Sequence, residues 1–558
     1  MSSDLGTALT ESLSRILPPE LAATALAATT KETTVKSQTT VKIQTATVMT
    51  LSAALERGDL GLDLNSPPPE GIDDGLWPTG VVNCLTACGW LVAANALDES
   101  PKAPIVLDGH WLRWRRWHCH LHHCLDHLLN LGGSALPHAL SDTQRDAACA
   151  TALQAGLDDQ QTKAVVAVLE HRLVLLTGGP GTGKTSTVVQ MLAVALASNP
   201  TVRIQLAAPT GKAAARLQQA VTSGSRALNT DAMHQLSRLP SSTLHRLLDA
   251  QGENRFRHNR HRPLPLDLLV VDEVSMVDLL LMEALLDALP DHAQLLLVGD
   301  PDQLPPVGPG AVLQELNQPQ HRQLLGPAAV ELQTTYRNNG AIAALAHQLR
   351  QSNGEISKAQ LRQLQPSDNV QWLEAERQSI PGLLQNQLIN HQRRLRSLAV
   401  ALRWHNDQPH PDDADLLLEE LDAWIALSPV RQGPWGVERL NRIVLGDWSR
   451  QSVQHWPVGT PVLNRHNRPE QGLANGDIGV VVQQERDIRV LLPGQRILHP
   501  AQFTGAEPAF AMTIHKSQGS QYAEVALLLP PVRHPDPRLT YTGLTRARQK
   551  VLLITPQD

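Results

Sequence analysis

The stretch GGPGTGKTS, residues 178–186, combines glycines, a lysine and two hydroxyl residues in the spacing of a phosphate-binding loop. Glycines let the backbone turn its N–H groups inward around phosphate oxygens, and the positive end of the following helix faces the same space. Lys184 would add a charge at the β- and γ-phosphates, and Thr185 a hydroxyl ligand for Mg²⁺. The pattern predicts nucleoside triphosphate binding by Gly178, Gly179, Pro180, Gly181, Thr182, Gly183, Lys184, Thr185 and Ser186.

A pair of carboxylates follows the apolar run LLVV at 268–271. At the end of a buried strand, Asp272 would hold Mg²⁺ through water, and Glu273 would orient and deprotonate the attacking water. Gln303 follows another apolar run, LLLVGD, and could contact the γ-phosphate from there. With the phosphate loop, these side chains predict hydrolysis of a nucleoside triphosphate but not its purpose.

Two arginines lie beside predicted strands or turns, Arg337 in TTYRNNG and Arg546 in YTGLTRARQK. A transferred phosphoryl group spreads negative charge, which a guanidinium delivered from a second domain can stabilise. Such a group typically contributes on the order of 10³–10⁵ in rate. We therefore interpret both arginines as catalytic candidates.

The segments that must position these residues alternate between short apolar runs and longer helix-like stretches. Runs such as RLVLL, RIQLAA and QLLLVG end at Gly, Pro or Asp, which is typical of buried parallel strands in an α/β domain. From about residue 455 the strands become short and rich in turns, which indicates a small β-barrel insert. At 558 residues the chain is too long for one core, so several domains are expected.

Composition narrows the class of protein. Hydrophobic residues make up 42% and charged residues 18%, as in ordinary folded proteins. The net charge of −6 argues against a uniformly basic nucleic-acid coat protein, but it leaves room for DNA in a locally basic cleft. The sequence shows no signal peptide and no apolar run of membrane-spanning length. With only five cysteines, a reduced, cytoplasmic protein is expected.

Taken together, the motifs resemble a superfamily 1 helicase core. APTGKAAARL, STLHRLL and AMTIHKSQGSQY match RecD-type helicases in order and spacing. RHNRHRPLPLDLLVVDEVSMVD, DALPDHAQLLLVGDPDQL and QGPWGVERLN look specifically like the RecD family, the alpha subunits of exodeoxyribonuclease V (RecBCD). The resemblance covers roughly residues 155–558 and only faintly the first 150.

The resemblance implies an α/β fold with two RecA-like P-loop lobes, each a parallel sheet flanked by helices. A small SH3-like β insert in the second lobe and a mixed amino-terminal domain complete it. The expected domains are a subunit-docking domain at 1–140, lobe 1 at 141–325, lobe 2 at 326–450 and 507–558, and the insert at 451–506.

It also implies an ATP- and Mg²⁺-dependent motor that moves 5′→3′ on single-stranded DNA. Gln161 would read the adenine, and closure of the lobes around ATP would move one lobe along the strand. DNA contacts without sequence readout are expected at Thr210, Lys212, His245, Thr513, His515 and Lys516.

The implied partners are single-stranded DNA, double-stranded DNA ends, and RecB-like and RecC-like subunits in double-strand break repair by homologous recombination. The nuclease would belong to another subunit. Two departures from the family are Val274, where Ala is usual, and the lack of Phe after Arg337. Two alternatives remain: a stand-alone RecD-like helicase, and a scaffold subunit without ATPase activity.

Two tracts are open to more than one interpretation. RFRHNRHR, at 255–262, suits either a solvated loop or a DNA clamp. In WLRWRRWHCHLHHCLDH, at 111–127, a helix would place His120, Cys124 and His127 on one face, where Cys84 and Cys88 could complete a tetrahedral zinc site. The other interpretation is a strand followed by a polar helix of the docking domain, with its histidines on the surface.

Overall fold

The computed structural model describes residues 35–558 apart from 57, 70, 137–140, 227, 229, 253, 337–340, 353–357, 364–368, 467, 469–470, 531–535, 537 and 558. Arg337, a predicted catalytic residue, therefore lies outside the described residues. The chain divides into two compact units. One comprises the residues up to His127 with Asp278–Glu283 and Pro305–Val312, and the other contains the rest.

The amino-terminal unit is built on a four-stranded sheet of order β1-β4-β3-β2. Its strands are β1 (Gly61–Asp63), β2 (Leu91–Ala93), β3 (Ile105–Asp108) and β4 (Trp111–Trp114), and its longer helices are α3 (Val35–Glu56), α4 (Thr79–Ala87) and the start of α5 (Arg115–Gly133). Only β2 and β3 run parallel. Leu85, Ile105 and Leu112 form its fully buried core. The fold is mixed, as predicted.

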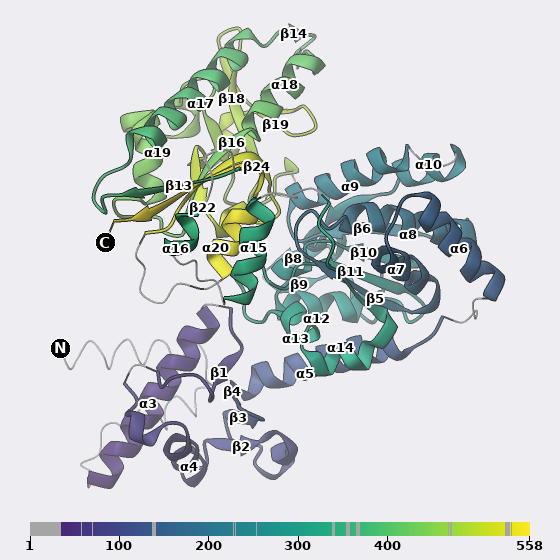
Figure 1. The fold of residues 1–558 in the computed structure, drawn as a ribbon, viewed down its shortest axis with the longest axis vertical. Helices are drawn as coiled ribbons and strands as arrows, with labels where there is room; N and C mark the ends of the chain where they lie inside the picture. The colour runs from purple at the N-terminus through teal and green to yellow at the C-terminus, as the bar shows by residue number, and fades with distance from the viewer. Residues whose placement is uncertain are drawn as a thin grey trace. The chain divides into compact units, whose positions relative to one another are not determined.

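Six parallel strands form the first sheet of the larger unit, in the order β12-β5-β11-β10-β6-β7. They are β5 (Leu173–Gly178), β6 (Ile204–Ala208), β7 (Ser241–Thr243), β10 (Leu268–Val271), β11 (Gln294–Gly299) and β12 (Ala329–Leu332). Helices α7 (Asp159–Glu170), α8 (Lys184–Ser198) and α9 (Gly211–Ser225) lie around this sheet in Figure 1. Strands β5 and β10 are buried along their whole length, which explains their uninterrupted apolar sequences.

The expected boundary between the lobes, at residues 325/326, falls before the last strand of the first sheet. β12 pairs in parallel with β5, and Leu332 is opposite Gly178. Val330 and Leu332 are buried in this sheet, so the first lobe extends beyond residue 325.

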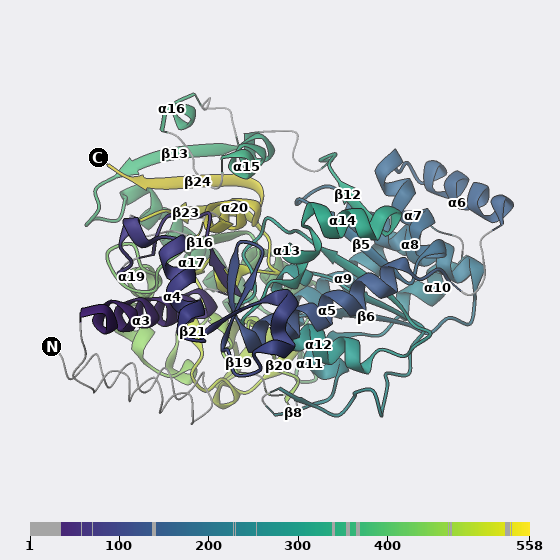
Figure 2. The ribbon, with the colours of Figure 1, turned by 90° about the horizontal axis from the view of Figure 1, so that it is seen from below.

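The second sheet has five parallel strands in the order β13-β24-β23-β16-β22. Figure 2 shows four of these strands side by side: β13 (Val370–Ala375), β24 (Ala547–Pro556), β23 (Tyr522–Leu528) and β16 (Trp424–Ser428). β22 (Ala511–Thr513) completes the edge, and α15 (Ala341–Gln351), α17 (Gly382–Ala401), α18 (Pro411–Leu421), α19 (Val437–Leu445) and α20 (Arg538–Thr545) belong to the same lobe. Two parallel sheets with helices confirm the predicted α/β class.

A separate antiparallel sheet lies where the β insert was expected. Its strands are β17 (Pro461–Leu463), β18 (Ile478–Gln484), β19 (Asp487–Leu492), β20 (Arg496–Leu498) and β21 (Glu507–Pro508), paired in the order β20-β19-β18-β17-β21. Val462, Val481 and Val490 are fully buried in its core. Its last strand lies just beyond the expected end at 506, and its SH3-like class stays a prediction. No helix in the described part of the chain is both long and apolar enough to cross a membrane.

Candidate active site

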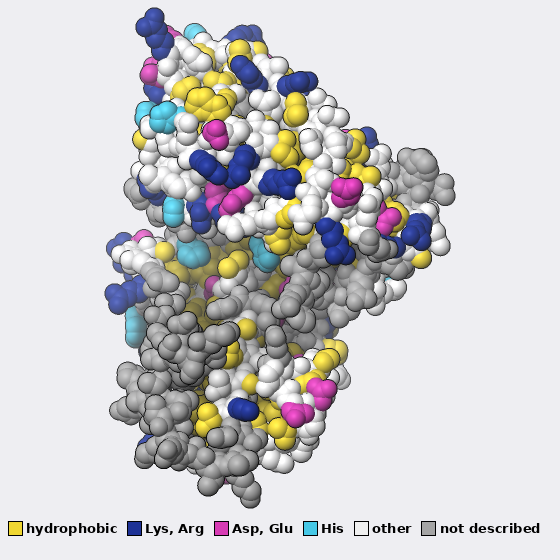
Figure 3. Space-filling view, turned by 90° about the vertical axis from the view of Figure 1, so that its left-hand side faces the viewer, with side chains coloured by type: hydrophobic (Ala, Val, Ile, Leu, Met, Phe, Trp, Pro, Cys, Tyr) yellow, Lys and Arg dark blue, Asp and Glu magenta, His cyan; other side chains and the backbone are white. Residues whose placement is uncertain are grey.

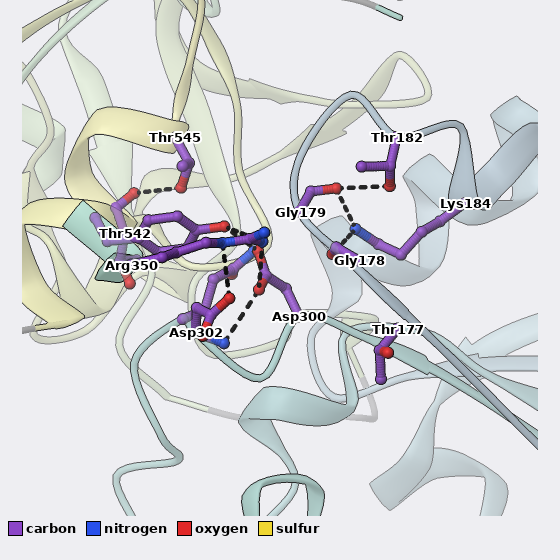
Figure 4. Close-up of polar contacts among 12 residues, drawn as sticks. Thr177, Gly178, Gly179, Thr182, Lys184, Asp300, Asp302, Arg350, Thr542 and Thr545 are labelled. Carbon is purple, nitrogen blue, oxygen red and sulfur yellow. Dashed lines mark hydrogen bonds and ion pairs between the residues drawn. The ribbon is translucent and has the colours of Figure 1, made fainter. Parts of the chain in front are cut away.

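The phosphate loop connects the buried end of β5 to the start of α8, as its sequence predicts. Gly181 and Gly183 have φ angles of 77° and 81°, in the left-handed region that side chains disfavour. Lys184 Nζ donates to the carbonyl oxygens of Gly178 and Gly179 at 2.7 and 2.9 Å. Figure 4 shows this lysine folded back over the loop, where a triphosphate would replace the two carbonyls as its partner.

Gln161 is held beside this loop by the first turn of α7. The Asp158 side chain accepts from Gln161 N at 2.8 Å, and Gln161 Oε1 accepts from Asp158 N at 3.1 Å, a reciprocal cap. The free end of the amide, Nε2, donates to Thr182 O at 3.3 Å. A Cβ atom on Gly183 would collide with that amide, so the loop and Gln161 fit only with glycine here.

The two carboxylates lie at the end of β10, between β6 and β11. Burial raises the pKa of Asp272, and the adjacent Glu273 carboxylate raises it further. Glu273 takes a left-handed backbone conformation, with φ of 54°. A non-glycine residue in this region is strained, and such strain is typical of functional positions. The donor set of Thr185 and Asp272 is the hard oxygen chemistry that Mg²⁺ prefers.

Gln303 and Arg546 approach the same space from different sheets. Both line a cavity of about 390 Å³ with the phosphate loop, Asp272 and Glu273. Gln303 is buried; its Nε2 donates to Asp300 Oδ2 at 3.1 Å, while its Oε1 has no hydrogen-bond partner among the described residues. That unpaired acceptor suits a water molecule. Arg546 is 2% exposed, and its Nε and Nη1 donate to Thr542 O and Ser520 O, both at 3.2 Å.

Tyr336 is a site residue that the sequence motifs did not single out. Its N–H donates to Gly181 O at 2.8 Å, and its hydroxyl donates to Asp158 Oδ2 at 2.6 Å. This hydrogen bond raises the pKa of Tyr336 to about 12, so the phenol stays neutral. The ring is half exposed and lines the nucleotide cavity. Its position directly before Arg337 was the available signal.

The second lobe brings Thr513 and Lys516 together in a different cavity, of about 370 Å³, also lined by Arg431, Arg442 and Arg450. Thr513 Oγ1 accepts from Lys516 N at 3.4 Å. Lys516 Nζ donates to Glu507 Oε2 at 2.6 Å, and Arg465 lies 3.0 Å from Glu507 Oε1. Burial would raise the pKa of Glu507, but Lys516 and Arg431 outweigh it and hold the pKa below its usual value. One carboxylate thus gathers several cations around a cavity.

Lys212 lies in a different environment from the one expected of a DNA contact. Its side chain is 11% exposed, its Nζ is 2.9 Å from Asp422 Oδ1, and it lies 5.1 Å from the centre of the Tyr522 ring. Thr210 caps α9 through a bond from Ala213 N to its Oγ1 at 3.2 Å. In this conformation the lysine joins the lobes, and its predicted contact with DNA stays a prediction.

His245 and His515 are exposed, as DNA contacts require. His245 follows the cap residue Thr243 at the start of α11 (Leu244–Leu247), and its ring lies 6.1 Å from that of Phe256. Phe256 belongs to the basic run 255–262, which is otherwise mostly exposed. Figure 3 shows the general pattern: Lys and Arg side chains are interspersed with Asp and Glu on the face that it presents.

The Cys/His tract forms a strand and then a helix, β4 and α5, but the predicted zinc set is not brought together. His120 Nδ1 pairs with Glu283 at 2.8 Å, and Cys124 is fully buried near Leu279 O. In the described part of the chain, Asp108, His118 and His122 are the one group of three or more His, Cys, Asp or Glu side chains whose ligand atoms lie close enough to share a cation.

The expectation of surface histidines is also wrong for His118, which is 3% exposed. Its helix turns this face toward the sheet, and its ring lies 4.1 Å from that of His122. Asp108, which both histidines face, is already paired with Arg113 at 2.6 Å. The negative charge of Asp108 is therefore already neutralised by Arg113, without a metal ion.

Two protein-family profiles match parts of the chain. Residues 161–309 match an AAA domain, and residues 508–554 match a UvrD-like helicase C-terminal domain. The two matches cover the phosphate loop and the carboxylates in the first lobe, and Arg546 in the second.

Relatives match over much more of the chain. It is 36% identical to the RecBCD enzyme subunit RecD of Mycolicibacterium smegmatis over 90% of this chain and 87% of that protein. The RecBCD enzyme subunit RecD of Haemophilus influenzae is 31% identical, covering 72% of this chain and 69% of that protein. The ATP-dependent RecD2 DNA helicase of Deinococcus radiodurans is 31% identical, over 71% of this chain but 48% of that protein. Among solved structures, Bacteroides Pif1 bound to single-stranded DNA is 19% identical, with a TM-score of 0.41 over 71% of this chain and 91% of that one.

Proposed function

This chain belongs to the RecD family, and from that premise we propose that it is an ATP-dependent DNA helicase, the RecD-like subunit of a RecBCD helicase–nuclease. It would translocate 5′→3′ on single-stranded DNA in the cytoplasm and act at double-stranded ends during recombinational repair. The observation that carries the proposal is the nucleotide cavity, which takes Lys184, Asp272 and Glu273 from the first lobe and Arg546 from the second.

In the proposed reaction, the phosphate loop binds the triphosphate and Lys184 neutralises its β- and γ-oxygens. Thr185 and, through water, Asp272 would hold Mg²⁺, which supplies charge neutralisation when bound. Glu273 takes the proton of the attacking water, and the free oxygen of Gln303 orients that water. Arg546, held by two backbone carbonyls, places its remaining donors toward the developing charge.

The nucleotide base would be bound at the other end of the cavity. Gln161 offers amide hydrogen bonds to the adenine, and the half-exposed ring of Tyr336 offers a face on which it can stack. Arg337, which follows that tyrosine, is proposed as the second arginine at the γ-phosphate from its sequence motif alone.

Coupling to DNA would follow from closure of the lobes. The cations around Glu507, with Thr513, form a cavity suited to a phosphate backbone, because salt-bridged lysine and arginine can exchange a carboxylate for a phosphate. Thr210, His245 and His515 are further proposed contacts. Lys212 would contact DNA only after release from Asp422.

A stand-alone helicase is the second candidate, since the RecD2 helicase of Deinococcus is also a relative. Only 48% of that protein is covered, against 87% of the mycobacterial subunit, and this difference favours the subunit role. A scaffold without ATPase activity is disfavoured by the catalytic candidates that line the cavity, which are Lys184, Asp272, Glu273, Gln303 and Arg546.

The test uses the chain co-expressed with its RecB-like and RecC-like partners. We expect all three to co-purify, and ATP hydrolysis to rise with single-stranded DNA and be lost in Lys184→Gln. In a complex with a motor-dead RecB-like chain, unwinding should require a 5′ tail. Hydrolysis that survives Lys184→Gln would contradict the site, and unwinding by this chain alone would favour the stand-alone alternative.

A further inference from the structure

Arg350, on α15 of the second lobe, lies against the phosphate loop although no sequence motif includes it. A Cβ atom built on Gly179 would lie 2.6 Å from Arg350 Nη2 and 3.3 Å from the hydroxyl oxygen of Tyr541. Figure 4 shows Arg350 beside Asp300 and Asp302, with Gly179 and Lys184 on the other side of the site. The position of Arg350 allows it to transmit events in the loop to the second lobe.

The guanidinium group is bound to both lobes. Its Nε lies 2.7 Å from Asp302 Oδ2, and its Nη2 lies 3.7 Å from Asp300 Oδ1. The same Nη2 donates to the Tyr541 hydroxyl at 2.8 Å, and the group lies 5.3 Å from the centre of that ring. Arg350 therefore holds two carboxylates of the first lobe and one phenol of its own lobe in a fixed arrangement.

Tyr541 continues the network to the carboxylate that controls Gln303. Its hydroxyl donates to Asp300 Oδ2 at 2.9 Å, and Gln303 Nε2 donates to the same oxygen at 3.1 Å. Burial raises the pKa of Tyr541 well above its usual value, and the Asp300 carboxylate raises it further, so the phenol remains a donor. Asp300 is 1% exposed and depends on these donors, because a buried carboxylate without partners is costly.

A second link lies one residue further along α20. Thr542 Oγ1 accepts from Leu304 N at 2.9 Å, so consecutive residues of this helix hold both ends of the segment around Gln303. The helix ends at Thr545, and Arg546 follows it. The γ-phosphate candidates of the two lobes, Gln303 and Arg546, are thus connected through α20.

We propose that Arg350 is a positioning residue for ATP turnover, which acts with Tyr541 through Asp300 to set the amide of Gln303 when the lobes close. The inference rests on the proposed function and extends it to Arg350, which lies outside the sequence motifs. Arg350 is not proposed as a third arginine on the phosphate, because its Nε and Nη2 are both committed to the network. Without the guanidinium, Asp300 and Asp302 would face one another unscreened, and Gln303 would lose its fixed acceptor.

The test measures steady-state ATP hydrolysis with saturating single-stranded DNA, using the complete complex. For Arg350→Met we expect kcat to fall about tenfold while the KM for ATP changes less than about twofold, because transition-state geometry is lost and ground-state binding is kept. Tyr541→Phe, which removes one hydroxyl group and keeps the ring, should lower kcat in the same way if Arg350→Met gives little folded protein. Arg350→Lys should restore part of kcat, since it keeps the charge without the fork.

The decisive comparison repeats Arg350→Met in a Gln303→Ala background. Since Arg350 acts through Gln303, its effect there should shrink to less than about twofold. Arg403→Met is the matched control: Arg403, like Arg350, pairs with a carboxylate, but its partner is Asp413 of its own lobe and the pair lies on the surface, so turnover should be unchanged.

Three results would overturn the inference. The first is an unchanged kcat in Arg350→Met, and the second is a fall in kcat on adding Arg350→Met to Gln303→Ala that is as large as the fall in the wild type. The third is a raised KM for ATP with unchanged kcat, which would indicate direct contact with the nucleotide. A wild-type complex without DNA-stimulated hydrolysis would instead contradict the proposed function itself.

Discussion

Lys212 and Asp422 form an ion pair of 2.9 Å that joins the two lobes of the larger unit. Lys212 follows β6 of the first sheet, and Asp422 lies between α18 and β16 of the second lobe. Arg216, one turn further along α9, donates to Gly519 O and Gln521 Oε1, both at 3.0 Å. Three polar contacts at one end of α9 therefore hold the two lobes together in this structure.

If this ion pair holds the lobes together, Lys212→Ala and Asp422→Asn should change the KM for ATP in the same direction. The double variant should change the KM no more than either single variant does, which corresponds to a coupling free energy on the order of 0.5–3 kcal/mol. Steady-state kinetics of the four proteins measure this. If Lys212 instead acts only on DNA, Lys212→Ala alone will weaken binding of single-stranded DNA and the effects will add.

Glu273→Gln should abolish turnover while preserving nucleotide binding. The amide keeps the shape of the side chain but accepts no proton, so kcat should fall by about 10²–10⁴. Binding of a fluorescent ATP analogue should stay within about threefold of the wild type, since the loop and Lys184 are intact. Glu419→Gln, at an exposed position on α18, is the control. If Glu273→Gln hydrolyses ATP at more than a tenth of the wild-type rate, Glu273 is not the general base.

Tyr336→Ala should raise the KM for ATP by about tenfold with a smaller effect on kcat, because stacking binds the ground state and the transition state alike. Tyr336→Phe separates the ring from the hydroxyl. If stacking dominates, it should behave like the wild type; if the bond to Asp158 dominates, it should behave like Tyr336→Ala. Equal KM values in all three proteins would show that the ring does not contact the base.

The amino-terminal unit should lose stability in mild acid. Burial, and after it the neighbouring His122, lower the pKa of His118 to about 4; Asp108 opposes this shift, and Arg113 and Arg115 add to it. In the unfolded chain a histidine has a pKa near 6.5, so between pH 6.5 and 4 His118 is protonated in the unfolded chain but neutral in the folded one. Stability falls by about 1.4 kcal/mol per pH unit in that window and is unaffected above it.

Urea unfolding at pH 7 and pH 5 measures this difference. His118→Gln should lose less stability between the two pH values than the wild type does. His123→Gln, at an exposed position on the same helix, should behave like the wild type. Parallel losses in all three proteins would assign the acid sensitivity to other groups.

Lys516→Ala should weaken binding of single-stranded DNA of any sequence. One fewer cation at the phosphates should also reduce the slope of log affinity against log salt by about 0.7. Fluorescence anisotropy with two unrelated oligonucleotides at several salt concentrations measures both effects. Lys550→Ala, a surface lysine of the same lobe paired with Glu524, is the control. An unchanged salt slope would place the DNA elsewhere.

The catalytic motifs could be found from sequence because each is local. The loop at 178–186 and the carboxylates after LLVV are fixed by a strand that must be buried and by the turn that ends it. Parallel strands bring such ends to one edge of a sheet, so Lys184, Asp272 and Gln303 could be grouped without coordinates.

The partners that support these motifs could not be found in this way. Arg350 meets Asp300, and Lys212 meets Asp422, in each case from a distant part of the sequence and from the other lobe. His118 was misassigned because periodicity gives the faces of a helix but not which face meets Asp108 of the sheet. Burial at these positions comes from tertiary packing, which one sequence does not encode locally.

The strand that closes the first sheet has a mechanical consequence. β12 lies directly beside β5, and the chain that leaves it is bonded to the phosphate loop through Tyr336 N and Gly181 O. The segment that connects the two lobes thus contributes Tyr336 to the wall of the nucleotide cavity. A shift of the loop on ATP binding or phosphate release would therefore be passed by this hydrogen bond to the chain that leads into the second lobe, whether or not the surfaces of the lobes are touching at that moment.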